Sequence, residues 1–311
     1  MGAFKMRLLV IAERKSKIEP FLPAFRAKGF EVKYIRILKI GLVSKGRNVL
    51  VKTLGENIPQ CDAVFLQCRS SLAPFIEPLL EEFVARKIYC NSRLGSYYVG
   101  MNEPYKFVTL ALGGADISRL AITGSAASTD ALSKKERYPL LIKALLGNSV
   151  QQSMVVSNEK DFDFFLKSIQ GKIDAFMVHE YPEGDIVTCA VIGQKVFAIK
   201  RKFSPSAGVS ELSRGKIYKL SDEEMNSVIK ASRTCGYDIA QVELVNGKVF
   251  DVTVNVKWNV FNEICSENLE EHVAQFFYET MQLLGIDEGA SEKPGIVKKF
   301  LSKTFFRGFL K

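Results

Sequence analysis

The sequence predicts a mixed α/β protein that changes to an α+β pattern in its C-terminal part. Over the first 100 residues, short apolar runs alternate with helix-like segments, which is typical of a small, mostly parallel sheet covered on both faces. Farther along, strands follow one another across two-residue turns, which is typical of antiparallel hairpins. The length of 311 residues is enough for two or three packed units.

The α/β part is expected to contain four strands and two helices. Apolar or alternating runs predict strands, and apolar residues at helical spacing predict helices. The apolar stretch at 8–12 is too short for the hydrophobic region of a signal peptide and fits a buried first strand. In order, the expected elements are a strand at 6–12 (MRLLVIA), a helix at 18–28, strands at 31–37 (EVKYIRI) and 62–68 (DAVFLQC), a helix at 72–86 and a strand at 87–91 (KIYCN).

The rest of the chain is expected to form two further lobes and a tail. The sequence predicts an N-terminal domain at 1–100, a central lobe at 101–180, a C-terminal lobe at 181–290 and a tail at 291–311. The central lobe should contain a helix at 101–117, a strand at 118–123, a polar segment at 124–133, strands at 138–145 and 153–157 joined by a loop, a helix at 161–169 and a strand at 174–181. The C-terminal lobe should contain a hairpin at 183–203 turning at Gly193-Gln194, a helix at 221–235 with a capping box between Ser221 and Glu224, a hairpin at 238–256 turning at Asn246-Gly247, and a helix at 269–284.

Composition and charge narrow the class of protein. No run of 18 apolar residues occurs, so no transmembrane helix is expected. The six cysteines are scattered without a CxxC pair, which favours reduced, mostly buried thiols in a cytoplasmic protein. The two histidines have no partner at metal-ligand spacing, so a zinc site is not expected. The net charge of +9 favours an anionic ligand.

The last residues form a distinctive basic segment at 296–311. On a helix, five of its large apolar residues would share one face beside a row of lysines and an arginine. Such a segment could lie peripherally on an anionic membrane or bind a protein partner. Its phenylalanines could equally pack on the surface of this chain. The apolar residues are Val297, Phe300, Leu301, Phe305 and Phe309.

Six stretches between about residue 101 and residue 263 occur in an order and at a spacing typical of one superfamily. They are NEPYKFVTLALGGADISRL, YPLLIKAL, MVHEY, GDIVTCAVIGQKVFAIKRK, CGYDIAQVELV and DVTVN. In this order they resemble the ATP-grasp superfamily, particularly the RimK-type glutamate ligases and glutathione-synthetase-like ligases. The resemblance implies an ATP-grasp fold, in which two lobes enclose a nucleotide and an N-terminal βαβ domain precedes them.

The resemblance implies a role for each of several residues toward ATP. Lys106 and Lys143 match lysines that contact the phosphates. Glu180 and Tyr181 match the hinge that faces adenine. The implied roles on the next hairpin are contact with the ribose for Asp185, contact with the phosphates or substrate for Lys200, and a catalytic role for Arg201.

The resemblance also implies a Mg²⁺ site on the last two strands. Glu243 matches the first metal carboxylate, and Asn255 matches the asparagine of a Glu-x-Asn motif. Thr253 stands where that motif has its glutamate. Asp251, two residues earlier, points to the same face of the strand and could substitute from about 6–7 Å farther along it.

Two other positions depart from the family pattern. The segment after the phosphate-binding lysine is normally a glycine-rich loop, but here it reads LLGNSVQQS. Val187 stands where the family often has an arginine. Together with Thr253, these departures affect the expected catalysis more than the expected fold. The charge of a metal ion stabilises the transition state for acyl-phosphate formation by several kcal/mol, as an order of magnitude.

The sequence therefore predicts an ATP- and Mg²⁺-dependent carboxylate–amine ligase that acts through an acyl phosphate on small-molecule or peptide carboxylate and amine substrates. The alternative is a catalytically degenerate ATP-grasp protein that binds nucleotide and a membrane or partner. No aromatic-basic RNA motif occurs, so a nucleic-acid partner is not expected. Simpler structural roles also remain open: Lys106 and Lys143 as solvated surface lysines, Gln241 and Glu243 as the exposed face of a strand, and Trp258 as a packing residue.

Overall fold

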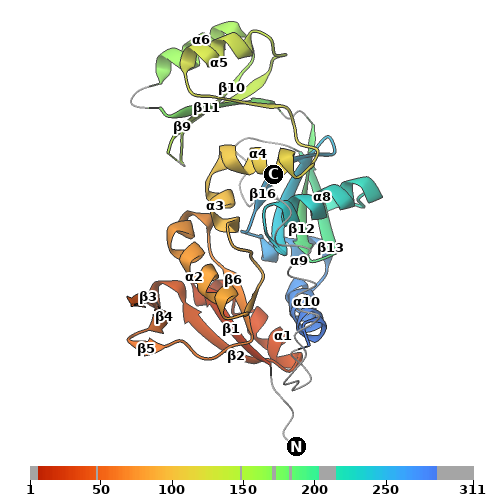
Figure 1. The fold of residues 1–311 in the computed structure, drawn as a ribbon. Helices are drawn as coiled ribbons and strands as arrows, with labels where there is room; N and C mark the ends of the chain where they lie inside the picture. The colour runs from red at the N-terminus through yellow and green to blue at the C-terminus, as the bar shows by residue number, and fades with distance from the viewer. Residues whose placement is uncertain are drawn as a thin grey trace, which may run out of the picture. The chain divides into compact units, whose positions relative to one another are not determined.

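The structure is a computed structural model that describes residues 6–46, 48–147, 149–169, 173–181, 184–202 and 215–285 (Figure 1). The basic segment at 296–311 lies outside these residues, so its expected roles stay predictions. The chain divides into two compact units. Unit 1 contains Met1–Cys68, Glu81–Asn91 and Asn268–Lys311, and unit 2 contains Arg69–Leu80 and Ser92–Glu267. In the part of the chain that is described, no helix is both long and apolar enough to cross a membrane.

Unit 1 is built on a four-stranded sheet that confirms the expected parallel arrangement. The strands are β1 (Arg7–Ala12), β2 (Glu31–Arg36), β6 (Ala63–Gln67) and β7 (Tyr89–Cys90). They follow the order β2-β1-β6-β7, and every neighbouring pair is parallel. In β1, five consecutive residues are buried, as expected for a central strand covered on both faces.

The end of the described chain completes the core of unit 1. Helix α1 (Phe21–Ala27), which follows η1 (Lys15–Lys17), lies beside α10 (Leu269–Leu283). Phe277 of α10 places its ring 5.4 Å from Phe25 of α1 and 5.6 Å from Phe65 of β6, both in edge-to-face geometry. The helix expected at 269–284 is therefore present, and it packs far back along the sequence.

A three-stranded antiparallel sheet in unit 1 was not expected from the sequence. It follows η2 (Ile37–Lys39) and contains β3 (Ile40–Lys45), β4 (Asn48–Thr53) and β5 (Glu56–Asn57). Its second turn uses Leu54 and Gly55 with φ of 51° and 88°, instead of an Asn-Gly pair. Its apolar runs, IGLV and VLV, are short, and they are only partly buried: Ile40 and Val51 are buried, whereas Val43 and Val49 are exposed.

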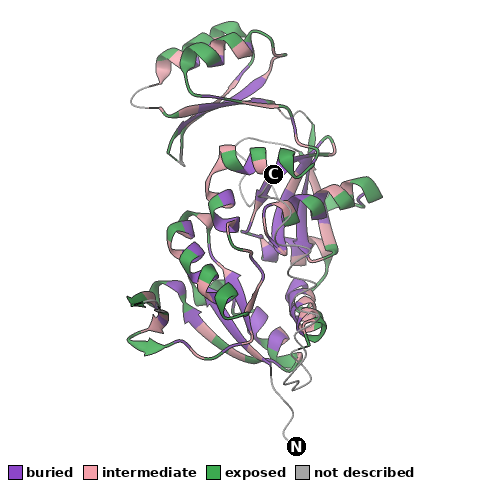
Figure 2. Cartoon of the chain, in the orientation of Figure 1, coloured by how far each residue is buried: buried purple, intermediate pink, exposed green. Residues whose placement is uncertain are grey.

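In unit 2, a small antiparallel sheet carries two helices on one face (Figure 1). Its strands are β8 (Leu120–Thr123), β9 (Leu140–Leu146), β10 (Ser149–Val156) and β11 (Ala175–Glu180), in the order β10-β9-β11-β8. Helices α5 (Ala126–Ser133) and α6 (Glu159–Ser168) cover it, and Phe162 and Phe165 of α6 are fully buried against the sheet. The outer faces of these helices are exposed (Figure 2).

The structure adds two details to what was expected for this small sheet. The polar segment at 124–133 contains α5, because Ser125 caps that helix by accepting a hydrogen bond from the Ser128 N–H at 3.1 Å. The segment LLGNSVQQS is not an extended loop. Strand β9 runs to Leu146 and β10 begins at Ser149, so only two residues separate the strands, and the first of them, Gly147, has a φ of 57°.

The second sheet of unit 2 confirms the two expected hairpins. It contains β14 (Lys216–Ile217), β13 (Lys195–Lys202), β12 (Asp185–Ile192), β15 (Ile239–Val245) and β16 (Lys248–Thr253), in that spatial order. Asn246 and Gly247 adopt φ of 50° and 76°, as a primed two-residue turn requires. Helix α8 (Asp222–Thr234) begins with the expected capping box, and α9 (Trp258–Cys265) was not expected. Trp258 is buried, which agrees with a packing role.

The segment that leads into the small sheet forms two short helices rather than one. Helix α3 (Ser96–Met101) ends one residue before Asn102, whose side chain caps α4 (Glu103–Leu112) by accepting from the Tyr105 N–H at 3.0 Å. Helix α2 (Ala73–Ala85), after η3 (Ser70–Leu72), carries Glu77. The Glu77 carboxylate accepts hydrogen bonds from backbone N–H groups at the start of α3. Helix α4 buries Lys106 together with Phe107 and Leu110.

Candidate active site

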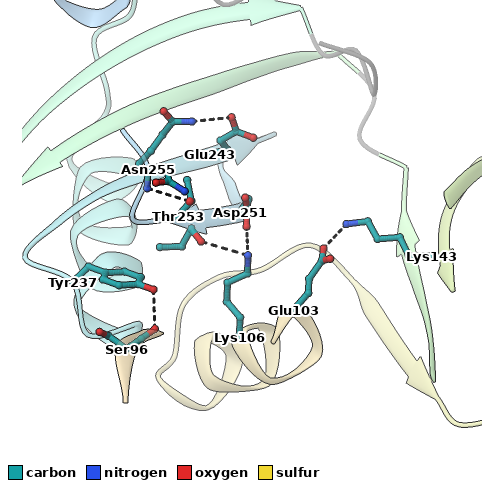
Figure 3. A network of polar contacts seen from close by, with 11 residues as sticks. Ser96, Glu103, Lys106, Lys143, Tyr237, Glu243, Asp251, Thr253 and Asn255 are labelled. Carbon is teal, nitrogen blue, oxygen red and sulfur yellow. Dashed lines mark hydrogen bonds and ion pairs between the residues drawn. The ribbon is translucent and has the colours of Figure 1, made fainter. Parts of the chain in front are cut away.

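Two carboxylates face each other across the hairpin of β15 and β16. Glu243 pairs directly with Asp251, and Gln241 pairs with Thr253 (Figure 3). An irregularity between Glu243 and Leu244 gives β16 one extra residue, Phe250, between these pairs and the turn. Asp251 therefore lies opposite Glu243, where side chains on one face approach to roughly 5 Å between Cβ atoms. The sequence suggested that Asp251 would reach the metal site from farther along the strand. The structure instead places it directly opposite Glu243.

Lys106 contributes a buried cation to this pair of carboxylates. Its Nζ forms an ion pair with Asp251 Oδ1 and lies 3.4 Å from the Val252 carbonyl oxygen. The Lys106 side chain is 8% exposed, whereas that of Asp251 is 37% exposed. Burial lowers the pKa of Lys106, but the Asp251 carboxylate outweighs this effect and the net shift is upward. Lys106 is therefore a charged, buried residue and not a solvated helix lysine.

Helix α4 also holds the second lysine through a residue that the sequence analysis missed. Lys143 lies in the middle of β9, and its Nζ forms an ion pair with Glu103 Oε1 (Figure 3). Glu103 is three residues before Lys106, so both side chains lie on the same side of the helix. The sequence feature that could have identified Glu103 is its position one helical turn before Lys106, the candidate phosphate-binding lysine. Both side chains of the Lys143–Glu103 pair are largely buried.

Arg201 brings a second cation to the pair of carboxylates formed by Glu243 and Asp251. Its Nη2 lies 3.6 Å from Glu243 Oε1, and its side chain is 10% exposed. Its buried Nε has no hydrogen-bond partner among the described residues. Burial raises the pKa of Glu243, the nearby Asp251 charge raises it further, and Arg201 offsets part of both effects. Gln241 Nε2 lies 3.4 Å from Glu243 and is itself buried, so these two residues are not an exposed strand face.

Lys200 and Asp185 do not join this cluster. Side chains alternate along a strand, so Lys200 points to the face of β13 opposite to that of Arg201. There its Nζ lies 2.9 Å from Asp185 and 5.4 Å from the centre of the Tyr218 ring. The contacts of these two residues with phosphates or ribose therefore stay predictions without support from the cluster.

The proposed hinge lies at the end of β11. Glu180 is its last residue and is exposed, while its N–H donates to the Arg119 carbonyl at 3.2 Å. The Tyr181 N–H donates to the Pro139 carbonyl at 3.2 Å. These bonds hold the backbone at the end of the strand, but no contact joins Glu180 to the carboxylate cluster in the described residues. Their role toward adenine stays a prediction.

His179 lies next to the hinge and was not selected from the sequence. It is buried between the rings of Phe107 and Phe250, with centroid distances of 5.1 and 6.3 Å. Neither ring nitrogen has a hydrogen-bond partner among the described residues. Burial, assisted by the charge of Lys143, lowers the pKa of His179 to about 3, so the ring is neutral at physiological pH.

The carboxylate pair offers suitable donors for Mg²⁺. Mg²⁺ binds oxygen and usually takes one or two carboxylates together with substrate phosphates. Glu243 and Asp251 supply such carboxylates side by side. Asn255 lies two residues beyond β16, and its N–H donates to Thr253 Oγ1 at 3.2 Å. The described residues contain no group of three or more His, Cys, Asp or Glu that could hold a metal alone. Glu243 and Asp251 are the carboxylates among these residues that could hold such an ion.

Comparison with known proteins supports the fold. No family model matches the chain. In sequence it is 25% identical over 267 residues to a protein of Desulfotalea psychrophila named probable alpha-L-glutamate ligase, covering 82% of this chain and 57% of that one. It is 26% identical over 265 residues to probable alpha-L-glutamate ligase 1 of Shewanella denitrificans, covering 81% and 88%. The chain thus spans less than two thirds of the first relative and most of the second.

Solved structures with lower sequence identity to this chain share its fold. The ATP-grasp ligase PsnB, complexed with a minimal precursor, superimposes with a TM-score of 0.68 at 13% identity, covering 89% of this chain and all of that one. A RimK domain ATP-grasp protein from Sphaerobacter thermophilus gives a TM-score of 0.63 at 12% identity, covering 87% and 98%. This chain has the ATP-grasp fold. The resemblance to RimK-type ligases expected from the sequence is confirmed.

Proposed function

We propose that this chain is an ATP- and Mg²⁺-dependent carboxylate–amine ligase that acts through an acyl phosphate. One observation carries the proposal. Two facing carboxylates, Glu243 and Asp251, lie in ion-pair contact with Arg201 and Lys106, which come from different elements of the ATP-grasp fold. A site that must bind a polyphosphate with a divalent ion needs both kinds of charge together.

The cations have distinct roles in this proposal. Lys106 and Lys143 neutralise the phosphates of ATP, and Glu180 and Tyr181 contact adenine. Arg201 stabilises the charge that develops on the transferred phosphoryl group or the acyl phosphate. Its buried position and unpartnered Nε support this role, because a fixed donor in a poorly solvated site stabilises developing charge more strongly than one in water.

The reaction proceeds in two displacements. An oxygen of the substrate carboxylate attacks the γ-phosphorus of ATP, the bond to the β–γ bridging oxygen breaks, and ADP leaves. The amine nitrogen of the second substrate attacks the acyl carbon, phosphate leaves with the electrons of the C–O bond, and the nitrogen loses its proton to solvent. The residues orient the reactants and balance charge, so no protein nucleophile is needed. When bound at Glu243 and Asp251, Mg²⁺ would neutralise the phosphate oxygens.

One observation supports this ligase over a degenerate nucleotide-binding module. The alternative relied on four features, namely Thr253 in place of a metal-binding glutamate, the altered segment after β9, Val187 and the basic tail. Because Asp251 lies directly opposite Glu243, the hairpin still presents two carboxylates to one ion. The loss at Thr253 is therefore compatible with metal binding.

The names of similar proteins suggest the class of substrate to test. Two relatives are named probable alpha-L-glutamate ligases. Structures of the ATP-grasp ligase PsnB are complexed with a minimal precursor, with a minimal precursor, Mg and ADP, and with a precursor peptide and AMPPNP. We propose an amino acid, with glutamate as the first candidate, and an acidic small molecule or peptide as the two substrates.

The test measures products and nucleotide affinity together. The full chain is incubated with Mg-ATP, glutamate and a panel of acidic amino acids and peptides. ADP, phosphate and an amide identified by mass spectrometry should form in equal amounts. Nucleotide binding that is accompanied by no turnover with any pair would favour the nucleotide-binding module. No nucleotide binding at all would refute both proposals.

A matched pair of lysine variants tests the assignment of the site. Lys143→Met should lower kcat/KM by about 100-fold, since it removes one of the phosphate contacts. Lys160→Met is the control, because Lys160 is an exposed lysine of α6 with no proposed role in the site, and it should change kcat/KM by less than about threefold. Equal losses in the two variants would contradict the proposed site.

A further inference from the structure

Lys106 connects two parts of the proposed site that bind ligands of opposite charge. By resemblance, it is a phosphate-binding lysine, yet in the structure its ammonium is paired with Asp251, one of the two carboxylates suited to a metal ion. The same side chain therefore belongs to the nucleotide subsite and to the metal subsite. Lys143 differs, because its partner Glu103 lies on α4 and not on the carboxylate hairpin.

The environment of Lys106 restricts its choice of partners. The ammonium is buried, and besides Asp251 its closest acceptor is the Val252 carbonyl at 3.4 Å, which is a weak contact. Asp251 also faces the like charge of Glu243, and each raises the cost of ionising the other in the absence of a cation. Lys106 supplies that cation from within the protein.

A divalent ion and Lys106 compete for the same carboxylate. An ion held by Glu243 and Asp251 would place two more positive charges beside the ammonium, in a poorly solvated position where such repulsion is strong. Phosphate oxygens would relieve this conflict, because they can accept Lys106 and also coordinate the ion. The charges of Lys106, Asp251, Glu243 and Arg201 balance before any ligand binds, so a metal ion alone disturbs that balance.

We propose that Lys106 and the metal ion exchange at Asp251, so that nucleotide and metal bind cooperatively. Phosphates draw Lys106 away from Asp251, and the released carboxylate joins Glu243 in binding the ion. By linkage, the metal must strengthen nucleotide binding by the same factor. This inference rests on the proposed function for the identity of the ligands, and it adds the order and coupling of their binding.

Mn²⁺ provides a direct probe of this exchange, because it accepts similar oxygen ligands and its free form is measured by electron paramagnetic resonance. Titrations use the full chain without nucleotide. Wild type should bind Mn²⁺ weakly, and Lys106→Met should bind it at least about tenfold more tightly, since the competing ammonium is gone. Lys160→Met, which removes an exposed lysine of α6, should match wild type. Equal or weaker Mn²⁺ binding by Lys106→Met would overturn the proposal.

Nucleotide titrations with ADP supply the reciprocal measurement. Mg²⁺ should tighten ADP binding to wild type by at least about tenfold more than to Lys106→Met, after correction for the Mg-ADP complex in solution. Glu103→Gln should tighten ADP binding equally with and without Mg²⁺, because it frees Lys143 without touching the metal carboxylates. An equal metal effect in wild type and Lys106→Met would overturn the coupling.

Two further results keep the proposal separate from the ligase proposal. Lys106→Gln repeats the metal titration should the methionine variant fail to fold, and it should also bind Mn²⁺ more tightly than wild type. If ADP and Mn²⁺ show the expected coupling but no substrate pair gives an amide, the ligase proposal fails and the exchange stands. If amide forms without the coupling, the exchange fails and the ligase proposal stands.

Discussion

The Lys106–Asp251 pair predicts that its two partners will affect stability unequally. The Lys106 side chain is 8% exposed, whereas that of Asp251 is 37% exposed. Asp251→Asn leaves a buried ammonium with an amide oxygen and a carbonyl 3.4 Å away. Removing one partner of a buried ion pair lowers the free energy of unfolding by roughly 3–5 kcal/mol. Because the amide oxygen and the Val252 carbonyl can still accept from Lys106, we expect Asp251→Asn to lower it by about 3 kcal/mol. Lys106→Met leaves a carboxylate that water can reach, so it should cost only about 1 kcal/mol.

The double variant turns this asymmetry into a stringent test. With both charges removed, no buried ion is left unpaired, so the double variant should be more stable than Asp251→Asn by about 1–2 kcal/mol. Unfolding in urea is followed by the fluorescence of Trp258, the single tryptophan, which is buried in unit 2. This local probe is useful because two-unit proteins often depart from a two-state transition.

The controls are Lys200→Met and Asp185→Asn. In the wild type, Lys200 and Asp185 form an exposed ion pair in the same unit, with side chains 42% and 44% exposed. Each should cost less than about 1 kcal/mol. The reasoning would be refuted if Asp251→Asn were no more destabilising than Lys106→Met. A double variant that is less stable than Asp251→Asn would refute it as well.

Three other predictions concern the metal strand, a buried carboxylate and a turn. Asp251→Asn should weaken Mn²⁺ binding in the presence of ADP by at least about tenfold, and adding Thr253→Glu should recover part of the loss, as measured by electron paramagnetic resonance. Burial raises the pKa of Glu77, so its stabilising contribution is present at low pH and is lost as the pH rises above the usual glutamate range. The difference in thermal stability between wild type and Glu77→Gln should therefore shrink between about pH 4 and about pH 7. Gly247→Ala should cost about 1 kcal/mol because its φ is 76°, whereas Gly41→Ala, with ordinary φ and no neighbour within 4 Å of the added carbon, should cost little in urea unfolding.

Local signals in the sequence were sufficient for most individual elements. The Asn246-Gly247 turn, the Ser221–Glu224 capping box and the alternating strands each depend on neighbouring residues, so the sequence predicts them well. The additional β3–β5 sheet was missed because its apolar runs, IGLV and VLV, are short and its second turn uses Leu54-Gly55. Helix α10 was predicted, but its packing on α1 depends on contacts between the two ends of the described chain.

The candidate site was harder to predict because its charges meet through tertiary contacts. A lysine on a helix is usually solvated, and nothing around Lys106 in the sequence indicates that it is buried against β16. Glu103 and His179 were missed for the same reason. Their partners Lys143 and Phe250 are distant in sequence. The resemblance selected Lys106, Lys143, Arg201 and Glu243, but it did not indicate which of them pair with each other.

The position of Asp251 has a consequence for how Thr253 is interpreted. In a regular strand, replacing a metal-binding glutamate by threonine removes a ligand, and the aspartate two residues earlier lies too far along the strand to replace it without rearrangement. The extra residue Phe250 changes the pairing near the turn, and Asp251 lies opposite Glu243. A strand irregularity can therefore preserve a pair of carboxylates when the motif itself is altered. Under the proposed function, β16 would carry a rearranged metal site, and the Lys106–Asp251 ion pair is the contact through which metal binding would depend on nucleotide.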